Sequence, residues 1–265
     1  MKFRILGSGG AIPTPRPLCQ CEICTLARKN DKYKRNSSSA YIEEINTLID
    51  CPEDIADSLN RQGIQKIDHL FITHWHPDHT FGLRVLLEAN YDFIENKAKN
   101  QIKIYIARKV YTTLKEKYPA LIYLTDVLKL AKIQFIEHKK EIVLGDIKIT
   151  PIGYQGKESE VYSFLFKKDN KKLVYAPCDT LHWKTYDIFC NLDILVHECG
   201  IFSYDKLKSE LSFPELLKRI KIINPQKTIL THIEEIELNR WGLKKLDELK
   251  QKNLEFAYDG LVIDL

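Results

Sequence analysis

A run of metal-binding residue types behind an apolar segment constrains this chain more than any other feature. The run 73–79 reads THWHPDH and follows the apolar segment 70–72. In an extended chain, residues two apart point to the same side, about 6.5–7 Å apart, so His74 and His76 can hold one ion together. Pro77 cannot continue a strand ladder, so the two ligand types after it lie on the following turn. Imidazole and carboxylate groups bind zinc, iron or manganese. The run therefore predicts a metal site where a strand ends, and the alternative is a histidine-rich surface turn.

Composition bounds the fold class and the partners. At 265 residues the chain can form one large domain or two small ones with a sizeable core. Its 40 Lys+Arg against 36 Asp+Glu give a net charge of +4, which is too small to argue for a nucleic acid or an anionic membrane, although it does not exclude a nucleic acid. There is no apolar run of about 18 residues, and Phe3–Gly7 reads as a strand rather than as part of a signal peptide. We therefore expect a cytoplasmic protein without a membrane partner.

The pattern of apolar residues predicts a mixed α/β protein. Early strands come in pairs and later ones alternate with helices, which indicates two mixed sheets covered by helices in a single domain, 1–265, without a dividing linker. The expected strands are 2–6, 41–45, 46–50, 67–73, 102–107, 133–136, 147–152, 162–166, 173–176, 194–196, 228–231 and 254–263. The expected helices are 52–62, 82–88, 185–189, 214–223 and 243–250.

Two segments fall outside this alternation. Residues 11–38 form a loop rich in proline and cysteine, and three of the seven cysteines, Cys19, Cys21 and Cys24, cluster there. In a reducing compartment such a cluster more often binds metal than forms disulfides. The stretch 90–130 lies in a region without glycine, and it is either a cap over the metal cleft or a packed structural insertion.

Two further ligand types stand at the ends of predicted strands. Asp179 follows the strand 173–176 and His232 follows the strand 228–231, each at the carboxyl end, as His74 does. Alone, either residue is typical of an ordinary polar loop. Three separate strands that deliver metal-binding side chains from the same end predict that these side chains converge on one site.

Together these motifs resemble the metallo-β-lactamase superfamily, whose metal pattern is H-x-H-x-D-H followed by His, Asp and His. The resemblance spans nearly the whole chain and is closest to the cyclic phosphodiesterases linked to phosphonate breakdown, the PhnP type. A pyrroloquinoline-quinone biosynthesis protein of the superfamily shares the C-x-C-x-x-C insertion. Beyond the run 73–79, the segments that carry the resemblance are 7–10, the cysteine cluster 19–24, 48–50, 178–180, 230–232 and 258–260.

The resemblance implies an αββα sandwich with two divalent ions, zinc, manganese or iron, along the rim where the sheets meet. The first ion would take two imidazoles, the second a carboxylate and two imidazoles, and a further carboxylate would bridge both. In that order the ligands are His74 and His76, then Asp78, His79 and His232, then Asp179. Asp50, at the end of another predicted strand, could orient a ligand imidazole through a hydrogen bond.

The chain departs from the superfamily pattern at the first ion. A histidine is expected shortly after a strand that precedes the bridging aspartate, but residues 149–156 read ITPIGYQG. Tyr154 or Gln155 could fill the gap through oxygen, as could a water, and His138 and His182 are substitutes from elsewhere. The second ion keeps four protein ligands and the first keeps three. We therefore expect the second ion to bind more tightly and the first to be lost or replaced more readily.

The cysteine cluster supplies three of the four ligands of a tetrahedral zinc site. The phosphodiesterase branch has a histidine three residues after His232, whereas this chain has Glu235 there. A carboxylate can bind zinc at about 2.0–2.2 Å, so the three cysteines and Glu235 would form a structural zinc site. Such a site would join the amino-terminal loop to the loop after the last active-site strand. The alternative is a reduced, metal-free cysteine loop.

Two residues are candidates for the acid that protonates the leaving group. The branch has a histidine near Glu210, and Glu210 could replace it if burial raised its pKa, although it could equally be a solvated carboxylate. His197, in the segment LVHEC, is similar to a residue of the RNA-processing nucleases of the superfamily. It could act as an acid or support a ligand, or it could be a core histidine. We also expect Asp78, which would be a ligand of the second ion, to be a catalytic residue.

The predicted site suits the hydrolysis of an anionic ester. Two divalent ions carry about +4 and the carboxylates of Asp78 and Asp179 about −2, so a site near +2 would attract a phosphodiester. A water between the ions would lose its proton near neutral pH, and the metal-bound hydroxide would attack phosphorus. Lys157, near the rim, could help to hold the phosphate.

We therefore expect a metal-dependent phosphodiesterase that acts on small phosphodiesters, cyclic ones included. One alternative is an RNA-processing nuclease of the same superfamily, against which stand the weak net charge and the lack of a basic or glycine-rich arm in the sequence. Another is a non-catalytic metal-binding or carrier protein on the same fold. The resemblance also leaves a homodimer open.

Overall fold

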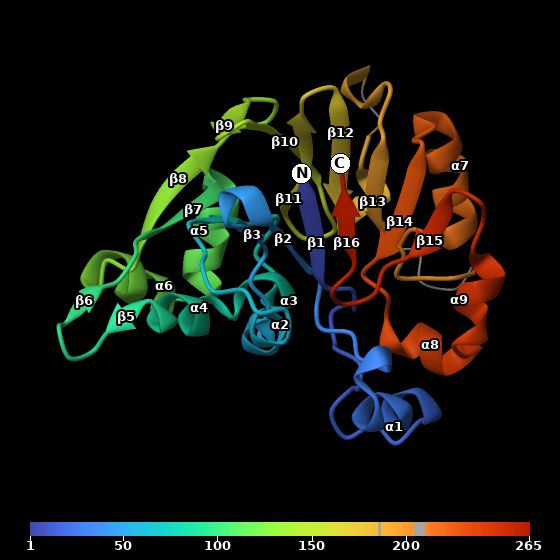
Figure 1. The fold of residues 1–265 in the computed structure, drawn as a ribbon, viewed down its shortest axis with the longest axis horizontal. Helices are drawn as coiled ribbons and strands as arrows, with labels where there is room; N and C mark the ends of the chain where they lie inside the picture. Colours follow the sequence, from blue (N-terminus) through green and yellow to red (C-terminus); the bar gives the residue numbers. More distant parts are fainter. Residues whose placement is uncertain (185–186, 204–209) are drawn as a thin grey trace.

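Two seven-stranded sheets pack against each other in the computed structural model, which describes residues 1–184, 187–203 and 210–265. Helices flank the two sheets, and the two ends of the chain lie side by side on neighbouring strands (Figure 1). Met1 N donates a hydrogen bond to Leu265 O at 2.6 Å. The predicted mixed α/β class, with two sheets between helices, is confirmed.

Each sheet is antiparallel on one side and parallel on the other. The first sheet has the order β16 Val262–Asp264, β1 Lys2–Gly7, β2 Ser39–Ile42, β3 Thr47–Ile49, β4 His69–Phe71, β7 Ile102–Ala107 and β8 Ala131–Ile136. The second has the order β15 Leu254–Phe256, β14 Lys227–Thr231, β13 Ile194–Glu198, β12 Lys171–Ala176, β11 Glu160–Lys168, β10 Ile147–Gln155 and β9 Ile142–Leu144. The parallel strands are β3, β4, β7 and β8 in the first sheet and β12, β13, β14 and β15 in the second. Parallel neighbours bring their carboxyl ends to one edge, where ligands bind in many α/β proteins.

The helices are short, and a small hairpin projects at one end of the molecule (Figure 1). The α-helices are α1 Glu22–Lys29, α2 Ile55–Arg61, α3 Pro77–Thr80, α4 Leu83–Ala89, α5 Arg108–Lys117, α6 Ala120–Ile122, α7 Phe213–Ile223, α8 Glu235–Trp241 and α9 Lys244–Leu249. Single helical turns of other types are Asp31–Tyr33, Glu43–Ile45, Tyr123–Val127, Thr180–His182 and Asp187–Phe189. The hairpin consists of β5 Tyr91–Asp92 and β6 Lys97–Ala98.

Local sequence explains the clearest helix start. At α7, Glu215 accepts hydrogen bonds from Ser212 N at 3.1 Å and from Ser212 Oγ at 2.6 Å, and Pro214 stands in the first turn. This capping box satisfies donors that would otherwise lack partners, and proline at this position loses no hydrogen bond.

Aromatic side chains from both sheets meet in the core. Phe71 of β4 stacks on Tyr105 of β7 with ring centroids 4.4 Å apart, and it meets Phe164 of β11 edge-on at 5.3 Å. Phe71 and Phe164 are fully buried and belong to different sheets. This pair therefore joins the two layers at the strand that leads into the metal-binding run.

The segment 254–263, predicted as one strand, forms two strands in different sheets. β15 closes the second sheet and β16 closes the first. Between them, the buried carboxylate of Asp259 accepts hydrogen bonds from Ser8 N at 2.9 Å, Ser8 Oγ at 2.7 Å and Asn36 N at 2.8 Å. These long-range bonds hold a turn within an otherwise strand-like sequence, and for that reason the prediction of a single strand was wrong.

Two segments that fall outside the predicted alternation of strands and helices contain regular structure. The loop 11–38 contains α1, where Cys21 Sγ accepts a hydrogen bond from Cys24 N as the helix cap. The stretch 90–130 contains β7, an integral strand of the first sheet, which favours the alternative of a packed structural insertion.

Other departures are smaller. The end of α5, within the stretch 90–130, reaches the metal-binding run, since Lys117 Nζ lies 5.6 Å from the ring centroid of Trp75. Of the predicted helix 185–189, residues 185–186 lie outside the described residues, and Asp187–Phe189 form a 3-10 turn.

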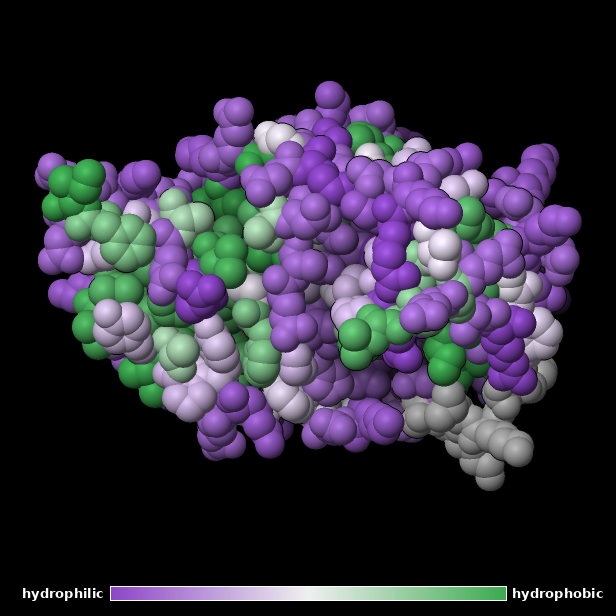
Figure 2. Space-filling model, turned by 90° about the horizontal axis from the view of Figure 1, so that it is seen from below, coloured by the Kyte–Doolittle hydropathy of each residue, from purple (hydrophilic) through white to green (hydrophobic). Residues whose placement is uncertain are grey.

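One end of the molecule presents hydrophobic side chains to solvent, as Figure 2 shows on its left, where β5 and β6 lie. In the turn between these strands, Phe93 is 73% and Ile94 is 93% exposed. The rest of this face is mainly hydrophilic (Figure 2). Among the described residues, no helix has the length and apolar character needed to cross a membrane.

We expect Phe164→Ala to lower the free energy of unfolding by about 3–5 kcal/mol, because it removes a buried ring between the sheets and leaves a cavity. Urea denaturation measures this loss. Phe93→Ala, at an exposed position, serves as the control and should change stability by less than about 1 kcal/mol. Equal losses for the two variants would contradict the role given to the ring between the sheets.

Candidate metal centre

The end of β4 and the start of α3 place the run 73–79. β4 ends at Phe71, an irregular segment continues to His76, and Pro77 opens α3 with His76 as its N-cap. Proline fits the first helical position because it has no N–H group to leave unpaired. His74 and His76 point to the same place, with 2.9 Å between His74 Nε2 and His76 Nδ1.

Asp78, His79 and His232 form a second group at the same edge. Asp78 Oδ2 lies 3.3 Å from His79 Nε2 and 3.6 Å from His232 Nε2. Nitrogen and oxygen ligands of one tetrahedral zinc ion stand about 3.4 Å apart, so these separations suit a shared cation. His79 Nε2 and His232 Nε2 are both buried and have no hydrogen-bond partner. Because buried polar atoms without partners are rare and costly, the group fits a metal ion.

The pKa values indicate how strongly this place favours positive charge. Burial alone would lower the pKa of His79, but the charges of Asp78 and Asp50 outweigh it and raise this pKa well above its ordinary value. Burial is likewise outweighed at His232, where the nearby carboxylates of Asp78 and Glu234 raise the pKa to about 10. Burial also fails to raise the pKa of Asp78, which the two imidazoles hold well below its usual range. A cation is therefore favoured between these groups.

Asp50 supports the run from behind. It follows β3, is fully buried and accepts hydrogen bonds from His79 Nδ1 at 2.7 Å, Thr73 N at 2.8 Å and Thr73 Oγ1 at 2.9 Å. β3 and β4 are parallel neighbours, so Asp50 stands beside the end of β4. The bond at Nδ1 leaves Nε2 of His79 directed at Asp78, which is the geometry by which carboxylates orient metal-binding imidazoles.

Asp179 enters from the second sheet. It follows β12, and Glu198 at the end of β13 accepts hydrogen bonds from the backbone N–H groups of Asp179 and Thr180. Lys157 N donates a hydrogen bond to Asp179 Oδ2 at 3.0 Å. Burial lowers the pKa of His76, and the charge of Asp179 partly opposes this shift. The carboxylate of Asp179 therefore acts on the imidazole of His76 from the second sheet.

Three of these residues adopt left-handed backbone conformations. Asp50 has φ 62°, Asp179 has φ 57° and His232 has φ 54°. Residues other than glycine rarely adopt this conformation, and such strain persists only where the surrounding structure imposes it. Each residue lies just beyond a strand with a parallel neighbour, so three strained turns bring side chains from both sheets to one edge.

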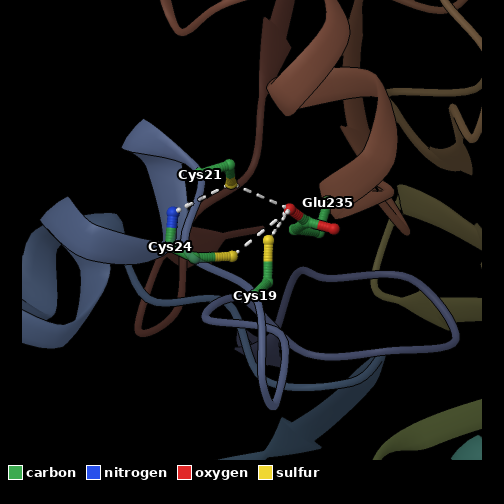
Figure 3. Close-up of side chains that lie close together, drawn as sticks. All are labelled: Cys19, Cys21, Cys24 and Glu235. Atoms are coloured by element: carbon green, nitrogen blue, oxygen red, sulfur yellow. Dashed lines mark hydrogen bonds between the residues drawn. The ribbon is translucent and has the colours of Figure 1, made fainter.

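The three clustered cysteines converge on Glu235, and Figure 3 shows them pointing to its carboxylate. The Sγ atoms of Cys19, Cys21 and Cys24 lie 3.6, 3.2 and 3.2 Å from Glu235 Oε1. Sulfur and oxygen ligands of one tetrahedral zinc ion stand about 3.6 Å apart, so a zinc ion fits among these four groups. Glu235 is buried at the start of α8, and Arg16 Nε lies 3.4 Å from its second oxygen.

The sequence profile of the beta-lactamase superfamily domain matches residues 45–233, well over half of the chain. The chain belongs to this superfamily. The family predicted from the metal-binding motifs is thereby confirmed.

The curated relatives of this chain have different names. A ribonuclease Z of Listeria monocytogenes is 26% identical in an alignment that spans 100% of this chain and 99% of that protein. A ribonuclease Z of Haloarcula marismortui is 33% identical over 37% of this chain and 26% of its own. An octanoyltransferase of Porphyromonas gingivalis is 33% identical over 31% of this chain and 17% of its own. In the last two matches the chain spans about a quarter or less of the relative's length.

Several solved structures share the fold of this chain. A diphosphatase from the PhnP family aligns with 100% of this chain and 97% of its own, with a TM-score of 0.77 and 21% identity. Zn²⁺-bound PqqB from Methylobacterium extorquens aligns over 100% of both chains, with a TM-score of 0.81 and 17% identity. The short form of human tRNase Z aligns with 100% of this chain and 99% of its own, with a TM-score of 0.67 and 17% identity. At these identities the similarity establishes the fold and leaves the substrate open.

The side chains considered as substitutes for the missing superfamily histidine are engaged elsewhere or exposed. Tyr154 is buried and donates a hydrogen bond to a backbone carbonyl at 2.7 Å. Gln155 donates to two carbonyls in the turn between β10 and β11. His138 is exposed and accepts a hydrogen bond from a backbone N–H of β10, and His182 is exposed. The structure gives none of the four as a ligand of the first ion.

His197 is buried with both ring nitrogens in contact with other groups, which favours the interpretation as a core histidine over that as an acid. It is fully buried, with Nδ1 2.8 Å from Glu198 O and Nε2 3.2 Å from Arg219 Nη1. Burial and the charge of Arg219 lower its pKa to about 3, so it stays neutral near pH 7 with both nitrogens engaged. Its contact holds Arg219, which donates a hydrogen bond to Thr180 O beside Asp179 at 2.8 Å.

Glu210 borders the same edge of the sheets. A Cβ added at Gly200 would stand 3.9 Å from Glu210 Oε2 and 3.9 Å from Glu234 Cγ, so both side chains approach this glycine. Burial and the charge of Glu198 raise the pKa of Glu210 to about 7, and His232 opposes this shift. Near neutral pH the carboxyl group is therefore protonated in a large share of the molecules.

Sequence reasoning missed three residues of this centre. Cys178 is buried, with its sulfur close to two imidazoles of the run. Glu198 holds the turn of Asp179, and Glu158 Oε2 lies 3.6 Å from His76 Nε2. All three stand next in sequence to residues already singled out, which is the one signal that could have found them. Cys178 precedes Asp179, Glu198 follows His197 and Glu158 follows Lys157.

We expect Cys24→Ser to reduce the zinc content of the purified protein by one ion per chain and to lower its melting temperature, because Cys24 is the buried sulfur of the four-residue group. Elemental analysis and thermal unfolding measure the two effects. Cys190→Ser, at an exposed cysteine, is the matched control and should retain the zinc. Unchanged zinc content in Cys24→Ser would rule out metal binding at this group.

Proposed function

We propose that this protein is a metal-dependent hydrolase that cleaves phosphodiesters, with small and cyclic phosphodiesters as its substrates. The observation that carries the proposal is the pair of buried nitrogens of His79 and His232, which face Asp78 without a hydrogen-bond partner. Membership of the superfamily and the convergence of side chains from both sheets support it.

The chain offers ligands for two divalent cations, zinc, manganese or iron. The first position would use two imidazoles, the second would use a carboxylate and two imidazoles, and one carboxylate would serve both. These residues are His74 and His76, then Asp78, His79 and His232, then Asp179. When bound, such ions supply an activated water near neutral pH and neutralise charge on a reacting phosphate.

The charge of the site is less positive than the ligands alone suggest. The charge of about +2 expected from the sequence counted two divalent ions and the carboxylates of Asp78 and Asp179. Asp50 and Glu198 add two buried carboxylates, so this expected charge is too high. Lys157 opposes this effect, since its charge lowers the pKa of the nearby carboxyl group at position 210. We infer that a phosphodiester is held locally, by the cations and by Lys157, rather than by a broad positive field.

Glu210 would protonate the leaving group. It lies beside Gly200 at the edge that carries the metal ligands, and its pKa of about 7 provides a proton near neutral pH. A general acid is needed when the leaving group is an alkoxide, because such an anion is too basic to depart without a proton. A phenolate with strongly electron-withdrawing groups needs no such help.

A ribonuclease acting on precursor tRNA is the second candidate. The full-length similarity to a ribonuclease Z of Listeria monocytogenes favours it. The small net charge of +4 argues for a small substrate, because nucleic-acid binding relies on many phosphate contacts. A non-catalytic metal-binding or carrier protein is the third.

We expect the purified protein with Mn²⁺, Zn²⁺ or Ni²⁺ to hydrolyse bis-p-nitrophenyl phosphate and 2′,3′-cyclic nucleotides. His76→Ala should reduce these rates on the order of 100-fold or more, because it removes a ligand of the first ion. His138→Ala, at an exposed histidine, is the control and should retain activity. Turnover of precursor tRNA alone would favour the nuclease, and bound metal without any turnover would favour the carrier.

We expect Glu210→Gln to slow the hydrolysis of 2′,3′-cyclic nucleotides roughly 10²–10⁴-fold, because it removes the proton donor. The wild-type rate should decline as the pH rises through about 7, where Glu210 loses its proton, and the variant should lack this decline. Bis-p-nitrophenyl phosphate has a stable leaving anion and should be hydrolysed nearly as fast by the variant. Equal losses on both substrates would contradict the role of an acid.

A further inference from the structure

The four imidazoles of the centre share one arrangement. In each ring one nitrogen faces the metal-binding groups, and the other faces an oxygen of the protein. Opposite their metal-facing atoms, His79 Nδ1 meets Asp50 at 2.7 Å, His74 Nδ1 meets Thr73 Oγ1 at 2.9 Å and His232 Nδ1 meets Glu234 at 3.6 Å. Thr73 Oγ1 donates its own proton to Asp50, so it accepts one from His74. Such partners fix the tautomer that leaves the other nitrogen free for an ion.

His76 has the opposite orientation. Its Nδ1 faces His74 Nε2 at 2.9 Å, so its remaining nitrogen is Nε2, which lies 3.6 Å from Glu158 Oε2. Without a partner at Nε2, the proton of His76 could sit on Nδ1 and bond to His74. That tautomer would close the first metal position. A carboxylate at Nε2 favours the proton there and leaves Nδ1 with a lone pair.

The turn between β10 and β11 holds Glu158 in place. Lys157 N donates a hydrogen bond to Asp179 Oδ2, which joins this turn to the loop that follows β12. At Gly156 the backbone comes so close that an added Cβ would stand 2.7 Å from Asp179 Oδ2, so no side chain fits there. The turn therefore presents its next carboxylate, Glu158, to the outer side of His76.

We propose that Glu158 is a positioning residue that selects the Nε2–H tautomer of His76 and thereby prepares Nδ1 for the first metal ion. This inference rests on the proposed metal centre. The 3.6 Å between His76 Nε2 and Glu158 Oε2 is longer than a hydrogen bond. Because the Glu158 side chain is 58% exposed, a small rotation of this side chain can bring the two atoms within hydrogen-bond distance. Glu158 thus supports the position that lacks the superfamily's third imidazole.

Titration calorimetry with Mn²⁺ tests this role without an activity assay. Mn²⁺ prefers oxygen and imidazole ligands to thiolates, so the cysteine group contributes little heat. We expect two binding steps in the wild type and a roughly 10–100-fold weaker first-position step in Glu158→Ala, with the other step unchanged. Glu158→Gln keeps an acceptor oxygen and should lose less.

Glu160→Ala is the matched control, since Glu160 lies in the same hairpin and is hydrogen-bonded to Tyr162 instead of facing the centre. It should bind Mn²⁺ like the wild type, and thermal unfolding should show all variants folded. If Glu158→Ala binds Mn²⁺ at both steps with the same affinities as the wild type, the role of Glu158 is overturned, whereas the proposed function is not. An equal loss at both steps would also overturn it. A wild type that binds no Mn²⁺ would overturn this role together with the proposed function.

Discussion

The proposed metal centre depends above all on the hydrogen bonds of the buried Asp50 carboxylate. Asp50 accepts from the backbone and hydroxyl of Thr73, before Pro77, and from His79, after it. It thus fixes the residues before and after the turn at Pro77, whose conformation the local sequence does not determine. A buried charge is stable only when it is hydrogen-bonded, and three bonds of this kind meet that need. An imidazole held at Nδ1 can present only Nε2 to a ligand.

Buried carboxylates hold the other loops of this edge in the same way. Glu198 fixes the backbone of Asp179, and Asp259 fixes the backbone of Ser8. Ser8 O in turn accepts a hydrogen bond from the N–H of Ile233, the residue after His232. Each loop that carries or contacts a ligand is therefore tied to an acceptor from a distant part of the chain. The side chains of the centre are positioned before any ion binds, which lowers the entropic cost of binding.

The sequence predicted the parts of this protein that local chemistry determines. The strand–turn–helix around Pro77 follows from the spacing of the run, and the grouping of the cysteines with Glu235 follows from motif and resemblance. Partners far apart in sequence were not predictable. Glu158 reaches His76 across 82 positions, and although it follows Lys157 of the predicted rim, nothing in the sequence pairs it with that imidazole.

Errors in the predicted elements have similar causes. The apolar residues of 254–263 suggest one strand, but Asp259 bonds to the amino-terminal loop and divides it. The helix α1 was hidden in a segment whose prolines and cysteines are typical of loops, and the cap at Cys21 is visible only in three dimensions. His197 illustrates the reverse case, because a histidine within a functional motif became a buried partner of Arg219.

The strained turns at Asp50, Asp179 and His232 limit how this centre can be transferred to another protein. Left-handed conformations at residues other than glycine cost on the order of 1 kcal/mol or more each, against a typical net stability of about 5–15 kcal/mol for a folded domain. A graft that copied only the ligands onto a less constrained scaffold would relax these turns and scatter the donor atoms. The parallel strand ends and their carboxylate anchors would have to be transplanted along with the ligands.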